Sequence, residues 1–354
     1  MTGGFTLTGP GPQAGRLDAD CPDVYFTAGY GAADAAAQGG TWHSARLGRR
    51  IQLPYVLRAV ADGVTDGVSP YGYCGLHVEP GCPPDDLARF WAQAVACWRD
   101  QGMVSLFLRF SPLDPAPVAA VRALGTVRLA QHGETVAVAV DAGPRRVWEA
   151  MAGRARTAVR KAENAGLTAE LRPATALDLT AAAPFRRVYE RTMRRIGSAE
   201  RYLFPDGYYR LLSSGLDKDL LLVSVRGPGG EVVAAALVLR HRDRAHYHLA
   251  GSEPAAARDG ANNLLVWRIL EWAAETGCTR VHLGGGVGGD DGLLRFKTSF
   301  GGALVPWWTG AVVLDRDRYA ALTVARAHRL GCPVTDLRDG GFFPAYRAGR
   351  ALTR

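Results

Sequence analysis

A single lysine stands in an aromatic setting near the end of the chain. The segment Phe296-Lys297-Thr298-Ser299-Phe300-Gly301 follows a glycine-rich stretch at residues 284–289. A lysine ammonium held there could bind a phosphate or stabilise a developing oxyanion. The alternative is a surface lysine whose aliphatic stem covers Phe296 and Phe300. We rank Lys297 first among the catalytic candidates, and we count Phe296 among the substrate-binding ones. If the segment is extended, the side chain of Arg295 should point away from that of Lys297.

Tyr247 and His248 are the next candidates. They come at the end of an apolar strand, where successive side chains point to opposite faces, so one of them should face a cleft. A phenol there could hydrogen-bond an acceptor, and a neutral imidazole could take an ammonium proton. Core packing is the alternative for each residue.

Two basic helices offer candidate binding groups. On the predicted helix 179–197, Thr192, Arg194 and Arg195 could grip a phosphate, because guanidinium groups match phosphate geometry. The predicted helix 144–167 carries cations that could follow an RNA backbone, namely Arg154, Arg156, Arg160 and Lys161. A solvated helix face is the alternative for both groups.

Other motifs carry less chemistry. The run Gly284 to Gly289 satisfies G-x-G-x-x-G, but Asp290 and Asp291 follow it and would repel a pyrophosphate, so we reject a dinucleotide site. The six cysteines form no Cys-x-x-Cys pair and are predicted to be reduced thiols. We therefore expect neither a metal nor a cofactor.

Length and composition fix the broad class. The chain has 354 residues, 47% hydrophobic and 21% charged, which suits two globular domains of about 150 residues each. The net charge of +8 favours polyanionic partners only weakly. No signal peptide or membrane span is recognisable, so we expect a cytoplasmic protein without integral membrane association.

The chain shows signs of internal duplication. Tyr71-Gly72-Tyr73-Cys74-Gly75 corresponds to Tyr247–Gly251, and an amphipathic helix, a glycine and an apolar strand follow each segment. We add Tyr71 and Tyr73 to the candidate substrate-binding residues. The repeat predicts a mixed α/β (α+β) fold with domains at 1–148 and 149–316, residues 317–354 returning to the first.

The order of elements resembles the GNAT acyltransferase fold, and the second half is similar to the Fem family of aminoacyl-tRNA-dependent transferases. The resemblance covers about two thirds of the chain, and its most specific element is Phe-Lys-x-x-Phe-Gly at 296–301. It implies two tandem GNAT-like domains, an aminoacyl-tRNA donor, an amine acceptor, no DNA partner, and Lys297 beside the reacting ester. The acceptor would be an amine-bearing small molecule, a nucleoside-linked compound or a peptide, on a cell-wall precursor or a natural-product intermediate. The chain lacks the family's usual N-terminal opening and inserted helical hairpin, which places a small or nucleoside-linked acceptor on a par with the usual cell-wall one.

Two other functions remain open. The first is acyl transfer from coenzyme A, but Arg258-Asp259-Gly260-Ala261-Asn262-Asn263 has the wrong spacing for a pyrophosphate loop and replaces its glycines. The second is a non-catalytic RNA- or nucleotide-binding protein, which no RNA-binding motif supports. Assays with charged tRNA and acetyl-CoA would separate all three.

Overall fold

The computed structural model describes residues 4–11, 20–286 and 292–349. The chain divides into two compact units, residues 1–132 with 308–354 and residues 133–307. The division expected from the sequence, at 148/149 and 316/317, stays a prediction. Helices and strands both contribute heavily, so the predicted mixed α/β class is confirmed.

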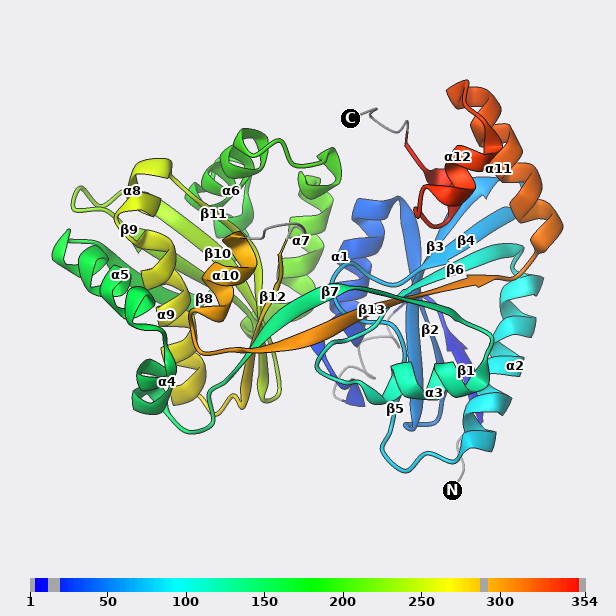
Figure 1. Cartoon of the computed structure of the whole chain (residues 1–354), viewed down its shortest axis with the longest axis horizontal. Coiled ribbons are helices and arrows are strands. Elements are labelled where there is room, and N and C mark those ends of the chain that lie inside the picture. Colours follow the sequence, from blue (N-terminus) through cyan, green and yellow to red (C-terminus); the bar gives the residue numbers. More distant parts are fainter. Residues whose placement is uncertain (1–3, 12–19, 287–291, 350–354) are drawn as a thin grey trace. The chain divides into compact units, whose positions relative to one another are not determined.

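One twisted sheet forms the centre of the second unit (Figure 1). The strands in this part of the sheet are, in spatial order, β8 (Thr168–Pro173), β9 (Leu220–Arg226), β10 (Val232–His241), β11 (Arg244–Ser252), β12 (Arg280–Gly285) and β7 (Arg128–Ala139). Only β11 and β12 run parallel, and α9 (Ala261–Glu275) connects them. The antiparallel β9–β10–β11 meander follows from aliphatic runs separated by tight turns.

Helices cover both faces of this sheet. On one face, α5 (Gly153–Asn164) and α9 share an apolar core with the strands, and α4 (Pro144–Ala150) lies beside them (Figure 1). On the other face lie α6 (Pro184–Arg195) and α7 (Asp206–Leu216). The apolar residues of α9 recur at helical spacing and are buried, as the periodicity of 261–277 predicts: Leu264, Leu265, Ile269, Leu270 and Ala273.

The first unit repeats the same plan. Its antiparallel strands β2 (Gly40–Leu47), β3 (Ile51–Ala61) and β4 (Val64–Val68) lead through α2 (Pro84–Asp100) to β6 (Met103–Arg109), which is parallel to β4. Two short strands extend the pairing: β1 (Phe5–Thr8) pairs with β2 at the edge, and β5 (His77–Val78) pairs with the beginning of β3. The remaining elements are α1 (Ala28–Gln38), α3 (Ala116–Leu124), α11 (Arg316–Leu330) and α12 (Val334–Asp339).

Two strands run across the division between the units. In β7 the residues of the second unit, 135–139, pair with β12, and in β13 (Ala303–Val313) the residues of the first unit, 309–313, pair with β6. After α12, the tail packs on the first unit: Tyr346 Oη lies 2.7 Å from Ser105 Oγ, and Arg347 forms an ion pair with Asp66. Both ends of the chain therefore contribute to the first unit.

Two expected elements differ. The single helix predicted at 144–167 is broken, because Met151 is extended (ψ 144°) between α4 and α5. Arg156 stabilises the break by donating to the carbonyl oxygens of Trp148, Glu149 and Met151. The segment around Lys297 is not extended but forms the short helix α10 (Gly292–Thr298).

Candidate active site

The parallel strands of the second unit separate at their carboxyl ends. Pairing between β11 and β12 stops at His246–His282, although β11 continues to Ser252 and β12 to Gly285. A bulge in β11 accompanies the separation, and its extra residue, Leu249, has a left-handed φ of 42°. A non-glycine residue in that conformation is uncommon, and such residues cluster at active sites and ligand-binding segments.

Lys297 lies where these strands part. Its Nζ donates to the carbonyl oxygen of Gly285 at the end of β12 (2.6 Å) and lies 5.9 Å from the ring centroid of Tyr247 on β11. The side chain is only 7% exposed, so the alternative of a surface lysine is wrong. The structure therefore brings Lys297 and Tyr247 together, with a buried cation touching both strands.

Aromatic packing holds the helix that carries Lys297. Phe296 and Phe300 meet edge to face, with ring centroids 5.2 Å apart, and both pack against the core under α9. Burial raises the pKa of Tyr247, so its phenol stays protonated and can donate a hydrogen bond. Arg295 is exposed, and it lies two residues before Lys297 on a helix, which directs the two side chains apart.

His248 lies on the opposite face from Tyr247, as strand alternation predicts. It is buried, and its Nε2 lies 2.8 Å from Tyr208 Oη of α7. Burial, together with neighbouring His246, lowers the pKa of His248 to about 3, so the ring is neutral at physiological pH and a weak base. Its predicted role as proton acceptor remains a prediction.

His248 belongs to a buried polar cluster that was not predicted from the sequence. The rings of His246 and His282 lie 5.6 Å apart, and His282 Nε2 lies 2.9 Å from Thr135 Oγ1 on β7. The alternation of His246 and His248 in an apolar strand indicates that these two histidines share one face of the sheet. The partners Tyr208 and Thr135 come from distant segments, which no local pattern announces.

The candidates on α6 support the end of β11. Thr192 Oγ1 accepts from the Ser252 amide (3.0 Å), and Arg195 donates twice to the Ser252 carbonyl oxygen (3.1 Å each). Arg194 forms an ion pair with Glu190 on the exposed side. These contacts assign Thr192 and Arg195 a positioning role, while phosphate binding by the three residues stays a prediction.

The predicted RNA-binding cations are tied to nearby backbone. Arg154 donates to the Arg295 carbonyl oxygen of α10 (3.1 Å), and Arg156 stabilises the α4–α5 break. Arg160 lies over the ring of Trp148, 5.6 Å from its centroid. Lys161 donates to the Arg258 carbonyl oxygen (2.8 Å) and pairs with Asp259. RNA binding by these residues remains a prediction.

Tyr71 and Tyr73 belong to the first unit, where the equivalent strands do not part. Residues beyond β4 continue beside β6: Arg109 donates to the Ser69 carbonyl oxygen (2.8 Å), and Cys74 forms a parallel bridge with Phe110. The Tyr71 carbonyl oxygen accepts from buried Tyr30, and Tyr73 packs on Tyr25. Their role in substrate binding stays a prediction.

The backbone before α9 is closely packed. Gly260 has φ 92°, and a Cβ there would lie 2.3 Å from the Ala158 carbonyl oxygen of α5. α8 (Pro254–Arg258) precedes it, and its last carbonyl accepts from Lys161. Helix α5 therefore lies against the segment that would have to cradle a pyrophosphate in coenzyme A-dependent transfer.

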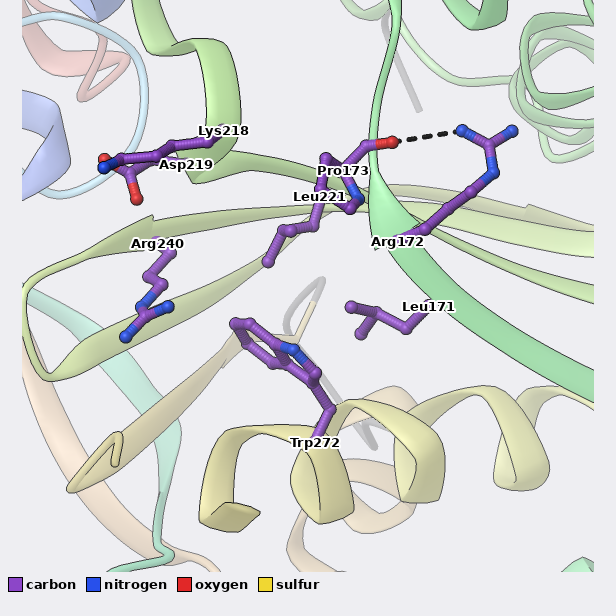
Figure 2. Close-up of a pocket in the computed structure, with 8 residues that line it drawn as sticks. All are labelled: Leu171, Arg172, Pro173, Lys218, Asp219, Leu221, Arg240 and Trp272. Carbon is purple, nitrogen blue, oxygen red and sulfur yellow. Dashed lines mark hydrogen bonds between the residues drawn. The ribbon is translucent and has the colours of Figure 1, made fainter. Parts of the chain in front are cut away.

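Two surface hollows lie elsewhere in the second unit. The first, of about 290 Å³, is at the ends of β8 and β10 that lie away from the parting of β11 and β12, and Arg240 stacks on Trp272 there, 5.7 Å from the ring centroid (Figure 2). The second, of about 390 Å³, lies between α4, α5 and α9. Neither includes Lys297.

Residues 287–291, which include the end of the glycine-rich loop with Asp290 and Asp291, lie outside the described residues. In the part of the chain that is described, no three His, Cys, Asp or Glu side chains gather as a metal site. Among the same residues, no helix is long and apolar enough to cross a membrane.

Known proteins are similar to this chain in part of its sequence and in its fold. Residues 150–298 match the family Acetyltransferase (GNAT) domain. The chain is similar in structure to FemX, with a TM-score of 0.69, 14% identity, and coverage of 89% of this chain and 98% of FemX. No curated protein sequence matches.

Two further solved structures share the fold. One is the C-terminal domain of a putative lysylphosphatidylglycerol synthetase from Agrobacterium fabrum, with a TM-score of 0.58, 16% identity, and coverage of 90% and 96%. The other is a conserved protein of unknown function from Bacteroides thetaiotaomicron, with a TM-score of 0.60, 10% identity, and coverage of 87% and 99%. The predicted tandem GNAT-like fold is confirmed, and within it residues 150–298 match the GNAT acetyltransferase domain family.

Proposed function

We propose that this protein forms an amide bond by moving an amino acid from aminoacyl-tRNA to the amine of a second substrate. The observation that carries the proposal is Lys297, a buried ammonium fixed between Gly285 and Tyr247 where β11 and β12 part. A fixed, water-shielded cation stabilises charge that develops during acyl transfer more strongly than a solvated one does. The match to a GNAT domain supports acyl transfer as the reaction class.

The reaction needs orientation and charge stabilisation more than covalent help. The amine nitrogen attacks the ester carbonyl carbon, the carbonyl oxygen becomes an oxyanion, and the ester oxygen of the RNA then leaves with a proton that the amine gives up. Lys297 would donate to the oxyanion or to the leaving oxygen while the Gly285 carbonyl keeps its Nζ in place. Tyr247, held in its protonated form, would donate a second hydrogen bond.

Two observations support RNA rather than coenzyme A as the donor. The backbone before α9 is in contact with α5 at Gly260, so its amides are poorly placed to receive a pyrophosphate. The fold is also shared with FemX and with the C-terminal domain of a putative lysylphosphatidylglycerol synthetase, a name that contains an aminoacyl group. This donor implies a cytoplasmic protein, because charged tRNA is a cytoplasmic molecule.

Acyl transfer from coenzyme A is the second candidate, favoured by the domain's description as an acetyltransferase. The acceptor amine is proposed only as a class, a cell-wall precursor or a natural-product intermediate. Purified protein would be given either charged tRNA or acetyl-CoA together with a panel of amines, and amide products would be measured by mass spectrometry. Products from charged tRNA alone support the proposal, whereas products from acetyl-CoA alone overturn it.

A further inference from the structure

Two tryptophans lie together on the surface of the second unit, beside a hollow. Two indoles, Trp148 of α4 and Trp267 of α9, meet with ring centroids 4.8 Å apart and an interplanar angle of 65°. Both are half-buried, and they border the hollow of about 390 Å³ with Arg160 of α5 and Pro144, Arg145 and Glu163. We call this site, defined by Trp148, Trp267 and Arg160, the indole platform.

The platform is held rigidly. Arg160 lies 5.6 Å from the centre of the Trp148 ring, a cation–π distance. Arg156 holds the end of α4 by donating to the Trp148 and Glu149 carbonyl oxygens, at 3.4 and 3.1 Å. An aromatic surface fixed before binding loses little conformational entropy when a ligand stacks on it.

The platform is also connected to the helix of Lys297. The Ala152 amide donates to the Ser299 carbonyl oxygen (2.8 Å), and Arg154 donates to the Arg295 carbonyl oxygen (3.1 Å). Gly301 lies against the same junction, since a Cβ there would be 2.9 Å from the Ala150 carbonyl oxygen. These contacts fix the platform relative to Lys297 within one unit.

The surrounding charge selects the class of ligand. Residues 144–164 carry six basic side chains and two acidic ones. A basic surface with exposed aromatic faces suits single-stranded nucleic acid, whose phosphates pair with the cations while its bases stack on the rings. An acidic peptide would satisfy the charge but would leave the indoles without a planar partner.

We propose that the indole platform stacks a base of the single-stranded end of an RNA. The inference rests on the proposed function for the identity of that RNA, the aminoacyl donor. It adds a recognition site outside the reacting centre, whose role is to hold the strand while its terminal ester reaches Lys297.

The test measures binding of the full chain to a fluorescein-labelled single-stranded RNA of about eight nucleotides by anisotropy. Trp148→Ala should raise Kd about 5- to 100-fold, the loss expected for one base–aromatic stack. Trp148→Phe keeps an aromatic face and should stay within about threefold of wild type. Arg160→Gln should lower the slope of log K against log salt by about 0.7.

Trp272 provides a matched control. It is a half-buried tryptophan on the same helix α9, with Arg240 stacked on it in the other hollow (Figure 2). Trp272→Ala should change Kd by less than about twofold if only the indole platform stacks RNA. Equal losses from Trp148→Ala and Trp272→Ala, or no loss from Trp148→Ala in a protein with an unchanged melting curve, overturn the inference.

Parallel assays separate this inference from the proposed function. Transfer from charged tRNA by wild type, with RNA binding unaffected by Trp148→Ala, means that the platform alone is wrong. RNA binding that depends on Trp148 without any transfer means that the proposed function is wrong. If coenzyme A displaces the RNA and Trp148→Ala weakens coenzyme A binding, the platform binds the adenine of coenzyme A and the inference fails. If Trp148→Ala does not fold, the RNA binding of Trp148→Phe and Arg160→Gln decides.

Discussion

Replacing Lys297 by methionine is the sharpest test of the candidate active site. Methionine keeps most of the volume of the buried stem but removes the ammonium. If this group stabilises the oxyanion, the single-turnover rate of transfer should fall by about 10²–10³, or about 3–4 kcal/mol of activation free energy. The rate would be measured with charged tRNA and a saturating amine acceptor.

The structure also sets the expected stability cost. Lys297 is buried and donates to Gly285, so it does not behave as the surface lysine for which truncation changes stability by less than about 0.5 kcal/mol. Losing the charge-assisted hydrogen bond from Lys297 to Gly285 costs about 1.5–3 kcal/mol. In a unit of this size, each kcal/mol lowers Tm by about 2–4 °C, so assays must run well below the melting point of the variant.

Arg295→Met is the matched control, because Arg295 is exposed on the same helix. It should transfer within about threefold of wild type, with a Tm shift corresponding to less than about 0.5 kcal/mol. A rate for Lys297→Met within a few-fold of wild type, or a larger defect in Arg295→Met, would refute the assignment of Lys297. If Lys297→Met loses activity only because it unfolds, its melting curve will show that it is unfolded at the assay temperature.

Three further predictions concern the surroundings of the site. Because His248 is held neutral in the folded state, its pKa of about 3 lies below the unfolded value of about 6.5, so the unfolded chain binds the extra proton first. The full contribution of His248 to the free energy of unfolding is present above pH 6.5, and it falls by about 1.4 kcal/mol per pH unit below that value. Urea unfolding at pH 7, 6 and 5 should show this fall in wild type and a smaller one in His248→Gln. Gly260→Ala should lower Tm more than Gly277→Ala does, because both have left-handed φ but only Gly260 meets a neighbouring carbonyl; equal shifts would contradict that packing. EDTA should leave transfer unchanged with pre-charged tRNA, and a loss that zinc or magnesium restores would disprove metal independence.

Local sequence determined much of the fold. The spacing of apolar residues in 83–102 and 261–277 predicts α2 and α9, and the alternation and turns of 220–252 predict the β9–β10–β11 meander. These elements follow from local periodicity, which depends only on near neighbours in the chain. The Phe-Lys-x-x-Phe-Gly segment was identified as a place for chemistry mainly through its resemblance to the Fem family.

Tertiary structure decided how that chemistry is arranged. Only the fold brings Gly285 and Tyr247 to Lys297, and only it buries His248 against Tyr208, a residue 40 positions away. At the break after Met151, the Ala152 amide donates to the distant Ser299 carbonyl oxygen (2.8 Å), a contact that the helical pattern of 144–167 does not indicate. Contacts between distant segments depend on how whole elements pack, and a local pattern of residue types does not encode that packing.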